Sequence, residues 1–292
     1  MKNIISIALI FIASFPLYAE ECLPKGMLIT AYSEGNWQLY LPDGKCGWNK
    51  VSTESEPRTP SLSVSNNSVA YVDAAGNVRE KKLESLEDLI IIEKSGLDAY
   101  TQLSYDASGN NLYAVLLKDG NSVDSDIVLW NRKNREISTV LSQRSAQFEP
   151  FPSKDGNVYY GNVSCTVQCK QVIQEIWELN ETGATVKQLT LLNATSRQPV
   201  SDGNGNIYFS SNKHHFFNIW KYSQKHKRSE KLTEGTVVDF SPVVISSKVY
   251  FIRKTPDDIS LMVLNTENKN AKPVTIKSQF EDIKELRLGR TE

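Results

Sequence analysis

Two stretches of this chain share one pattern: residues 148–160 read FEPFPSKDGNVYY, and residues 197–209 read RQPVSDGNGNIYF. Each has a short proline-containing segment, a polar turn with Asp-Gly, and an apolar-aromatic strand. Weaker copies begin near residues 59, 101 and 241. The copies recur every 40 to 50 residues, which is the period of a β-propeller blade rather than of a helical repeat.

The first apolar residue of the second strand marks each repeat. The successive spacings are 41, 43, 46, 49 and 42 residues, and the marks are Leu28, Val69, Leu112, Val158, Ile207 and Val249. Three repeats also close on a Leu-Thr or Val-Thr pair, whose threonine lies ten residues after the end of the third strand. The sequence therefore predicts an all-β, six-bladed propeller with four antiparallel strands in each blade.

The first blade leaves no room for an innermost strand between the start of the mature chain and Leu28. The segment 278–283, SQFEDI, resembles 146–151, AQFEPF, which opens the fourth blade. We therefore expect residues 279–289 to supply the inner strand of the first blade. Such a closure pairs the two ends of the chain and removes an exposed sheet edge.

The first 19 residues have the pattern of a secretory signal: Lys2, an apolar stretch over 4–15, and Ala19 at a plausible cleavage point. No second apolar run follows, so insertion into a membrane is not expected. We expect residues 20–292 to form a single propeller domain that is periplasmic or secreted by a bacterium.

Four cysteines form an even set, as in many exported proteins with disulfides. Three connectivities are possible, of which the local one pairs Cys22 with Cys46 and Cys165 with Cys169. Three residues separate Cys165 from Cys169, which is not the spacing of a redox pair, so both pairs are interpreted as structural. No histidine lies near them, and metal binding is not expected.

The formal net charge of −1 gives no electrostatic basis for binding nucleic acid. The basic run 225–228 lies between two strand patterns and is interpreted as a solvated hairpin turn. The run His214-His215-Phe216-Phe217 is predicted to be the hairpin between the second and third strands of the fifth blade, with an alternative role as an aromatic contact to a partner.

A functional site would form at the channel mouth, where the inner strands of all blades converge. The equivalent positions are predicted to be Thr59, Thr101, Glu149, Gln198, Ser241 and Glu281, preceded by Arg58, Tyr100, Phe148, Arg197, Phe240 and Phe280. The candidate partner-binding residues among them are Arg58, Tyr100, Phe148, Glu149, Arg197, Gln198, Phe240 and Glu281. Two isolated carboxylates and no histidine are a poor set for a metal or for acid-base catalysis, so no metal, cofactor or catalytic residue is expected. Packing between blades is the alternative role of the aromatic residues.

The repeat in the fifth blade runs from Gln198-Pro199-Val200-Ser201-Asp202-Gly203 through Ile207-Tyr208-Phe209 and Ile219-Trp220 to Leu232-Thr233. It resembles the repeat of the TolB-type periplasmic propellers, and the resemblance covers about two-thirds of the mature chain. The small α/β domain that precedes the propeller in TolB is not expected here. The resemblance implies a six-bladed propeller that binds a protein or peptide in the cell envelope.

The favoured function is therefore an exported, non-catalytic propeller, expected to be a monomer, that binds a protein or peptide through its channel mouth. Arginine and aromatic side chains are common in the central contacts of interfaces. The alternatives are a secreted propeller enzyme that acts on a glycan or sugar, and an accessory protein of an exported toxin or adhesin.

Overall fold

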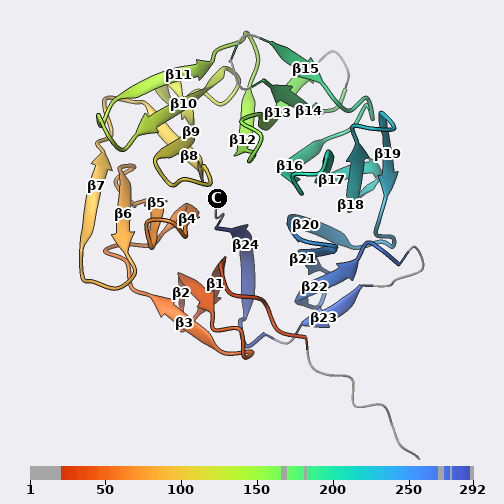
Figure 1. The fold of residues 1–292 in the computed structure, drawn as a ribbon, viewed down its shortest axis with the longest axis horizontal. Helices are drawn as coiled ribbons and strands as arrows, with labels where there is room; N and C mark the ends of the chain where they lie inside the picture. Colours follow the sequence, from red (N-terminus) through yellow and green to blue (C-terminus); the bar gives the residue numbers. More distant parts are fainter. Residues whose placement is uncertain are drawn as a thin grey trace, which may run out of the picture.

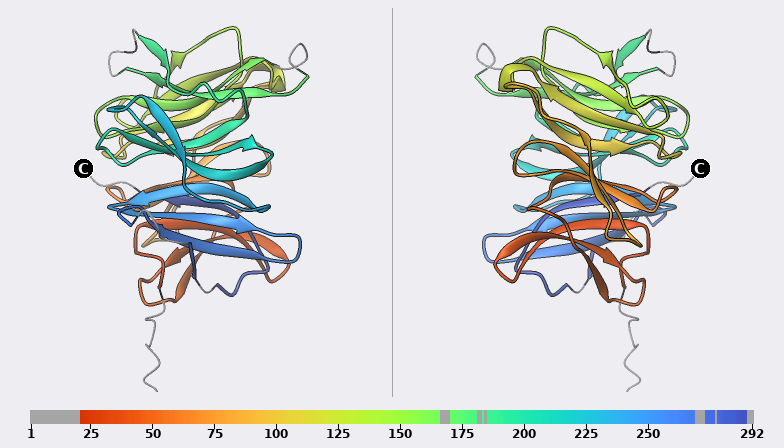
Figure 2. Two further views of the ribbon diagram at one scale, coloured as in Figure 1. Left: turned by 90° about the vertical axis from the view of Figure 1, so that its right-hand side faces the viewer. Right: turned by 90° about the vertical axis from the view of Figure 1, so that its left-hand side faces the viewer.

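A computed structural model of the chain describes residues 21–165, 170–180, 183, 185–268, 273–276 and 278–289. Six antiparallel sheets of four strands each stand around a central axis (Figure 1). Figure 2 shows the same ring edge-on, with the blades side by side. The predicted all-β, six-bladed propeller is confirmed.

The four strands of each blade follow one another from the inside of the ring outward. Blade one contains β24 (Asp282–Leu288), β1 (Met27–Ser33), β2 (Asn36–Pro42) and β3 (Trp48–Val51). Blade two contains β4 (Arg58–Ser63), β5 (Ser68–Val72), β6 (Val78–Lys82) and β7 (Asp88–Ile92). Blade three contains β8 (Ala99–Tyr105), β9 (Asn111–Leu117), β10 (Ser125–Asn131) and β11 (Ile137–Leu141), with the short 3-10 helix η1 (Lys118–Gly120) after β9.

Blades four to six follow the same order. Blade four contains β12 (Gln147–Pro152), β13 (Val158–Cys165), β14 (Ile173–Leu179) and β15 (Val186–Gln188). Blade five contains β16 (Ser196–Ser201), β17 (Asn206–His214), β18 (Phe216–Ser223) and β19 (Arg228–Lys231). Blade six contains β20 (Val238–Ile245), β21 (Lys248–Lys254), β22 (Ile259–Asn265) and β23 (Val274–Ile276).

The second strand of each blade is apolar on both faces because a neighbouring blade covers each face. All five residues of β5 are buried, for example. The six predicted marker residues, from Leu28 to Val249, are each at most 3% exposed. Strands buried on two faces read as continuous apolar runs rather than as an alternation, which is why these strands stand out in the sequence.

Each of the six contacts between neighbouring blades has its own apolar cluster among the described residues. The contact between blades one and two is formed by Leu28, Leu39 and Val51 with Leu62 and Val69, for example. Burying one such side chain stabilises the fold by about 1.5–3 kcal/mol. The propeller is therefore held by a ring of small cores rather than by one central core.

The ring closes between the two ends of the described chain, as predicted. β24 pairs antiparallel with β1, from Met27 opposite Leu288 to Tyr32 opposite Asp282. Figure 1 shows the blue β24 beside the red β1. Beyond the last pair, the N–H of Gly289 donates to the carbonyl of Gly26 at 2.8 Å.

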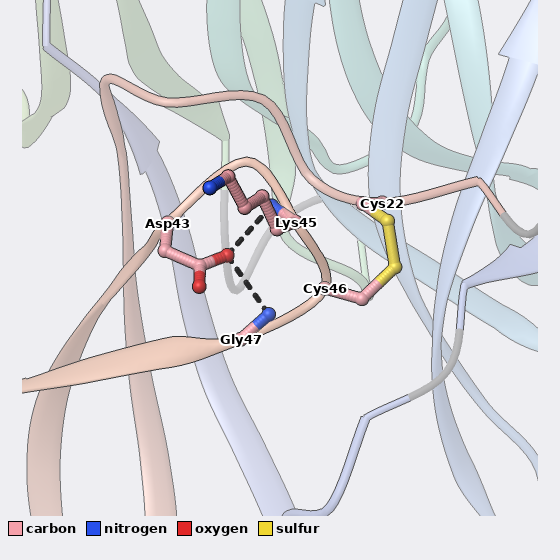
Figure 3. The surroundings of a disulfide bond; sticks show 5 residues. All are labelled: Cys22, Asp43, Lys45, Cys46 and Gly47. Atoms are coloured by element: carbon pink, nitrogen blue, oxygen red, sulfur yellow. Dashed lines mark hydrogen bonds between the residues drawn. A yellow bond between two sulfur atoms is a disulfide. The ribbon is translucent and has the colours of Figure 1, made fainter.

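The predicted disulfide between Cys22 and Cys46 is present, with the two Cα atoms 4.8 Å apart (Figure 3). The turn that carries Cys46 is held by Asp43, whose Oδ1 accepts the N–H groups of Lys45 and Gly47 at 2.6 and 2.9 Å. These two hydrogen bonds lower the pKa of the Asp43 carboxyl. The bridge ties the segment before β1 to the hairpin between β2 and β3.

Two predictions lie outside the described residues: the signal over residues 1–19, and the pairing of the Cys165 and Cys169 side chains. In the part of the chain that is described, no helix is long and apolar enough to cross a bilayer. Residues 225–227 of the basic run lie in the exposed turn between β18 and β19, as predicted, and Arg228 is the exposed first residue of β19.

Candidate functional site

The inner strands start on one side of the ring, which we call the upper face. Those of blades two to six each contain a bulge, where two residues of the inner strand lie opposite one residue of the second strand. The first residue of each bulge has a left-handed backbone with φ between 45° and 58°, and these residues are Thr59, Gln102, Glu149, Gln198 and Ser241. A bulge interrupts the in-and-out alternation of a strand and re-aims the side chain that it carries.

The bulges differ from the predicted equivalent positions in two blades. In blade three the bulge residue is Gln102 rather than Thr101, and Leu103 follows it, whereas a proline follows each of the other four bulge residues. In blade one the register of β24 shifts at Lys284, opposite Thr30 and Ala31, and not at Glu281. The Glu281 position is therefore not equivalent to those of the other bulge residues.

Three consecutive bulge side chains each hold the main chain of the next blade. Oε1 of Gln102 accepts the N–H of Glu149 at 2.8 Å, and Oε2 of Glu149 accepts the N–H of Gln198 at 2.6 Å. Oε1 of Gln198 in turn accepts the N–H of Ser241 at 2.8 Å. These contacts link blades three to six at the upper face.

Glu149 is also the centre of an ion pair. Its Oε1 accepts from Nε and Nη2 of Arg197 at 3.1 and 2.9 Å, and its side chain is only 4% exposed. Both carboxylate oxygens therefore already have donors. A general base must reach the proton that it removes, so a carboxylate that is buried and held by three hydrogen bonds suits a structural role better.

A cavity of about 450 Å³ opens at the upper face, and we call it the upper mouth. This volume lies within the range of about 300–1,000 Å³ that is common for ligand sites. The bulge residues of blades two to five and the side chains beside them form its wall, and its lining is Thr59, Thr101, Gln102, Glu149, Arg197, Gln198, Ser210, Phe217, Val238, Phe240, Lys284, Glu285 and Arg287.

Four of the eight predicted partner-binding residues line the upper mouth: Glu149, Arg197, Gln198 and Phe240. The other four do not. The Arg58 guanidinium donates to the carbonyl of Asp73, and Glu281 is exposed just before β24, where its N–H donates to the Tyr32 carbonyl at 3.2 Å.

Aromatic residues at the predicted positions mostly pack between strands. Tyr100 packs against the cluster between blades two and three, and burial, with the charge of Asp98, raises the pKa of its hydroxyl. Phe148 is half-buried on β12 opposite Gly161. Phe280 is buried with its ring centroid 4.6 Å from that of Tyr40. Only Phe240 among them lines the mouth.

Sequence reasoning missed several residues of the mouth: Gln102, Phe217, Val238, Lys284, Glu285 and Arg287. Phe217 had one signal in the sequence, because the run His214-His215-Phe216-Phe217 was given an alternative role as an aromatic contact to a partner, although it was not assigned to the mouth. Lys284, Glu285 and Arg287 of β24 lie around buried Ile283 and Leu286, and their direction is known only once the register of this strand is known.

The charges of the upper mouth are unequally exposed. The side chain of Arg197 is 45% exposed and Lys284 is exposed, whereas the side chains of Glu149 and Glu285 are 4% and 12% exposed. The Lys284 ammonium lies 5.7 Å from the centroid of the Trp37 ring. The surface that a ligand would meet is therefore cationic.

Below the upper mouth the channel narrows. A cavity of about 40 Å³ continues along the axis, lined among others by Pro199, Pro242 and Leu286. A second wide cavity of about 490 Å³ opens on the opposite face and is mostly apolar, with Phe151, Val244 and Leu288 in its wall. The described residues contain no group of three or more His, Cys, Asp or Glu side chains that could hold a metal ion.

The amino-acid sequence matches no protein-family model and no curated protein. Solved structures share its fold. TolB from Acinetobacter baumannii is 12% identical, with a TM-score of 0.73 over 91% of this chain and 67% of that one. A chain of the nidogen/laminin complex is 12% identical, with a TM-score of 0.68 over 91% and 99% of the two chains.

An oligogalacturonate lyase in complex with manganese is also similar, at 14% identity and a TM-score of 0.64 over 87% of this chain and 75% of that one. Binding proteins and enzymes thus share this architecture, and identities this low establish the fold alone. By its structure, the chain is a six-bladed β-propeller similar to that of TolB.

Proposed function

We propose that this chain is an exported, non-catalytic propeller that binds a protein or peptide partner in the bacterial cell envelope through its upper mouth. The observation that carries the proposal is the make-up of the mouth: cations and aromatic side chains are accessible, while Glu149 is buried and paired. Arginine and aromatic residues are enriched where interfaces bind most strongly.

Export is supported by the Cys22–Cys46 disulfide, because disulfides persist in oxidising compartments. We propose that residues 1–19 are removed and that residues 20–292 act as one monomeric domain. N-terminal sequencing of protein purified from the periplasm should begin at Glu20. A protein that keeps Met1 would contradict cleavage, and a dimer in light scattering would contradict the monomer.

An enzyme acting on glycans is not favoured, because Glu149 is buried and its carboxylate accepts three hydrogen bonds, from Arg197 and from the main chain of Gln198. A Glu149→Gln variant separates the two functions. If the chain were a glycan lyase or hydrolase that uses this carboxylate, the variant would lose turnover on a panel of polysaccharides, whereas a binding protein shows no turnover in either form.

The binding role is tested by affinity capture from envelope extract with immobilised protein. Arg197→Ala should weaken the capture of a partner severalfold, because Arg197 is accessible at the mouth. Arg58→Ala is the matched control, since Arg58 does not line the cavity. Equal capture by the wild type and Arg197→Ala would remove the upper mouth as the contact site.

A further inference from the structure

The upper mouth places an apolar surface between cationic side chains. Phe217 on β18 of blade five, together with Val238 and Phe240 on β20 of blade six, forms what we call the apolar shelf. Figure 1 shows that the inner strands β16, β20 and β24 of blades five, six and one follow one another around the axis, and the first of them carries Arg197 and the last carries Lys284. Val238 is 36% exposed and the two phenylalanines are half-buried, so a ligand can reach all three.

The cationic side chains of the upper mouth have N–H groups that can donate to a ligand. Arg197 donates from Nε and Nη2 to Glu149, and within the described ranges its Nη1 has no acceptor, so it can donate to a ligand. Lys284 forms no ion pair among the described residues, and its ammonium lies near the ring of Trp37. Arg287 donates from Nη2 to Glu285 at 3.0 Å. A carboxylate that enters the mouth could therefore accept from more than one of these groups.

Unpartnered polar atoms lie in the same wall. In the described part of the chain, Oγ1 of Thr59, Oε2 of Glu285 and Nε of Arg287 are buried and have no hydrogen-bond partner. The Glu285 side chain is 12% exposed. Buried polar groups normally have partners. Thr59 Oγ1 and Arg287 Nε can donate to a carboxylate, whereas Glu285 Oε2 can only accept and suits an N–H group of the same ligand.

The depth of the channel limits what can enter. The 450 Å³ of the upper mouth lead into a space of only about 40 Å³, which has no room for a further side chain. An extended segment can therefore place one or two side chains into the mouth without passing through the ring.

From these observations we propose that the upper mouth recognises an acidic residue next to a bulky apolar residue in an extended segment of its partner; this proposal rests on the proposed binding function. The acidic side chain lies at Arg197, Lys284 and Arg287, and the apolar side chain lies on the apolar shelf. Because the exposed cations repel basic segments, they also determine which partners are rejected.

The experiment selects from a phage-displayed library of random 12-residue peptides on the immobilised full-length mature protein. The enriched peptides should carry Asp or Glu within two positions of Phe, Trp, Tyr, Leu or Ile. An enriched peptide is then synthesised with its terminal charges removed. Replacing its Asp by Asn, or its Glu by Gln, should weaken binding by about tenfold or more. Increasing the salt concentration should also weaken binding progressively.

A charge reversal tests the same contact from the protein side. Lys284→Glu should abolish the preference for acidic peptides and favour basic ones, and because Lys284 is exposed the variant should stay folded. Lys225→Glu is the matched control, since Lys225 lies in the exposed β18–β19 turn away from the mouth.

Two contrary outcomes are distinguishable. Enriched peptides with no acidic residue, whose binding falls with Phe217→Ala but not with Lys284→Glu, would overturn this proposal and leave the proposed binding function in place. Failure of the wild type to select any peptide above a blank support, or selection unchanged by every mouth variant, would overturn both.

Discussion

The carboxylate of Glu149 accepts the main-chain N–H of Gln198 at 2.6 Å, across the contact between blades four and five. The same relationship links Gln102 to Glu149 and Gln198 to Ser241. In each pair, a side-chain oxygen of one bulge residue accepts the main-chain N–H of the bulge residue in the next blade. The rim of the mouth is thus held by the blades themselves, and Arg197 and Phe217 remain accessible for binding.

Replacing Glu149 by glutamine should lower the free energy of unfolding by about 1–3 kcal/mol, since a neutral amide weakens the charge-assisted bonds from Arg197 and Gln198. Urea unfolding followed by tryptophan fluorescence measures the loss. Glu84→Gln, at an exposed site, is the control and should change little. A Glu149→Gln variant as stable as the control would show that the bonds to Glu149 contribute little.

Removal of β24 should abolish cooperative unfolding. A chain that ends after Ser278 leaves β1 without its inner partner and takes Phe280, Ile283 and Leu286 from the core between blades six and one. A chain that ends after Gly289 keeps all of these contacts and is the control. If the shorter chain melts with the same midpoint and slope as the longer one, the closure is not required for the fold.

Loss of the disulfide should destabilise the protein without changing its fold. The bridge joins residues 24 positions apart, and the loop that it closes predicts a contribution of about 3 kcal/mol. Cys22→Ser and Cys46→Ser should therefore each lower the urea midpoint by a similar amount, and the double variant by no more than either. Additive losses would mean that the cysteines act separately.

Gly161→Ala should destabilise blade four. A Cβ atom at this position would lie 2.2 Å from Nε2 of Gln174, which is buried on the neighbouring strand β14. Overpacking of this kind costs about 1–3 kcal/mol. Combining it with Gln174→Ala makes room for the new methyl, so the double variant should be less destabilised than the sum of the single ones. Strict additivity would argue against the contact.

The stability of the contact between blades two and three should depend on acid pH through Glu80. Burial alone would raise its pKa, but hydrogen bonds from Arg132, Tyr105 and Ser68 outweigh burial and lower the pKa of Glu80 to about 2, from an ordinary value of 4.5. Because the folded state holds this proton less tightly, the contribution is complete above about pH 4.5 and is lost as the pH falls toward 2.

The measurement compares urea unfolding of the wild type and Glu80→Gln at pH 6 and pH 3. The wild type should be the more stable at pH 6, and the difference should shrink at pH 3. Glu84→Gln serves as control, with a difference from the wild type that does not depend on pH. A Glu80 difference that is constant between the two pH values would contradict the lowered pKa.

The blades could be predicted from the sequence because their second strands are buried on both faces and their repeats keep a regular period. The closure was predictable for a similar reason, since residues 278–283 repeat the opening of another blade. The mouth was only half predictable. A bulge breaks the two-residue period on which strand patterns depend, so the directions of side chains beyond it do not follow from spacing.

Particular residues illustrate the limit. Gln102 has no following proline, so nothing in the sequence marks its bulge. Lys284 and Arg287 depend on the register of β24, which is determined by pairing with a strand more than 250 positions earlier in the chain. Phe217 reaches the mouth from a hairpin of the blade, not from an inner strand, and comes near Phe240 only through the packing of blades five and six.

The hydrogen bond between Gly289 and Gly26 brings the two ends of the described chain next to each other. Because the first and last described strands are adjacent, a short linker could join them covalently, and new termini could be opened in the exposed turn around Leu86, between β6 and β7. The resulting circular permutant would keep every strand pair of the ring. In such a molecule each blade could be made first or last, because the architecture depends on neighbours in space and not on a starting point.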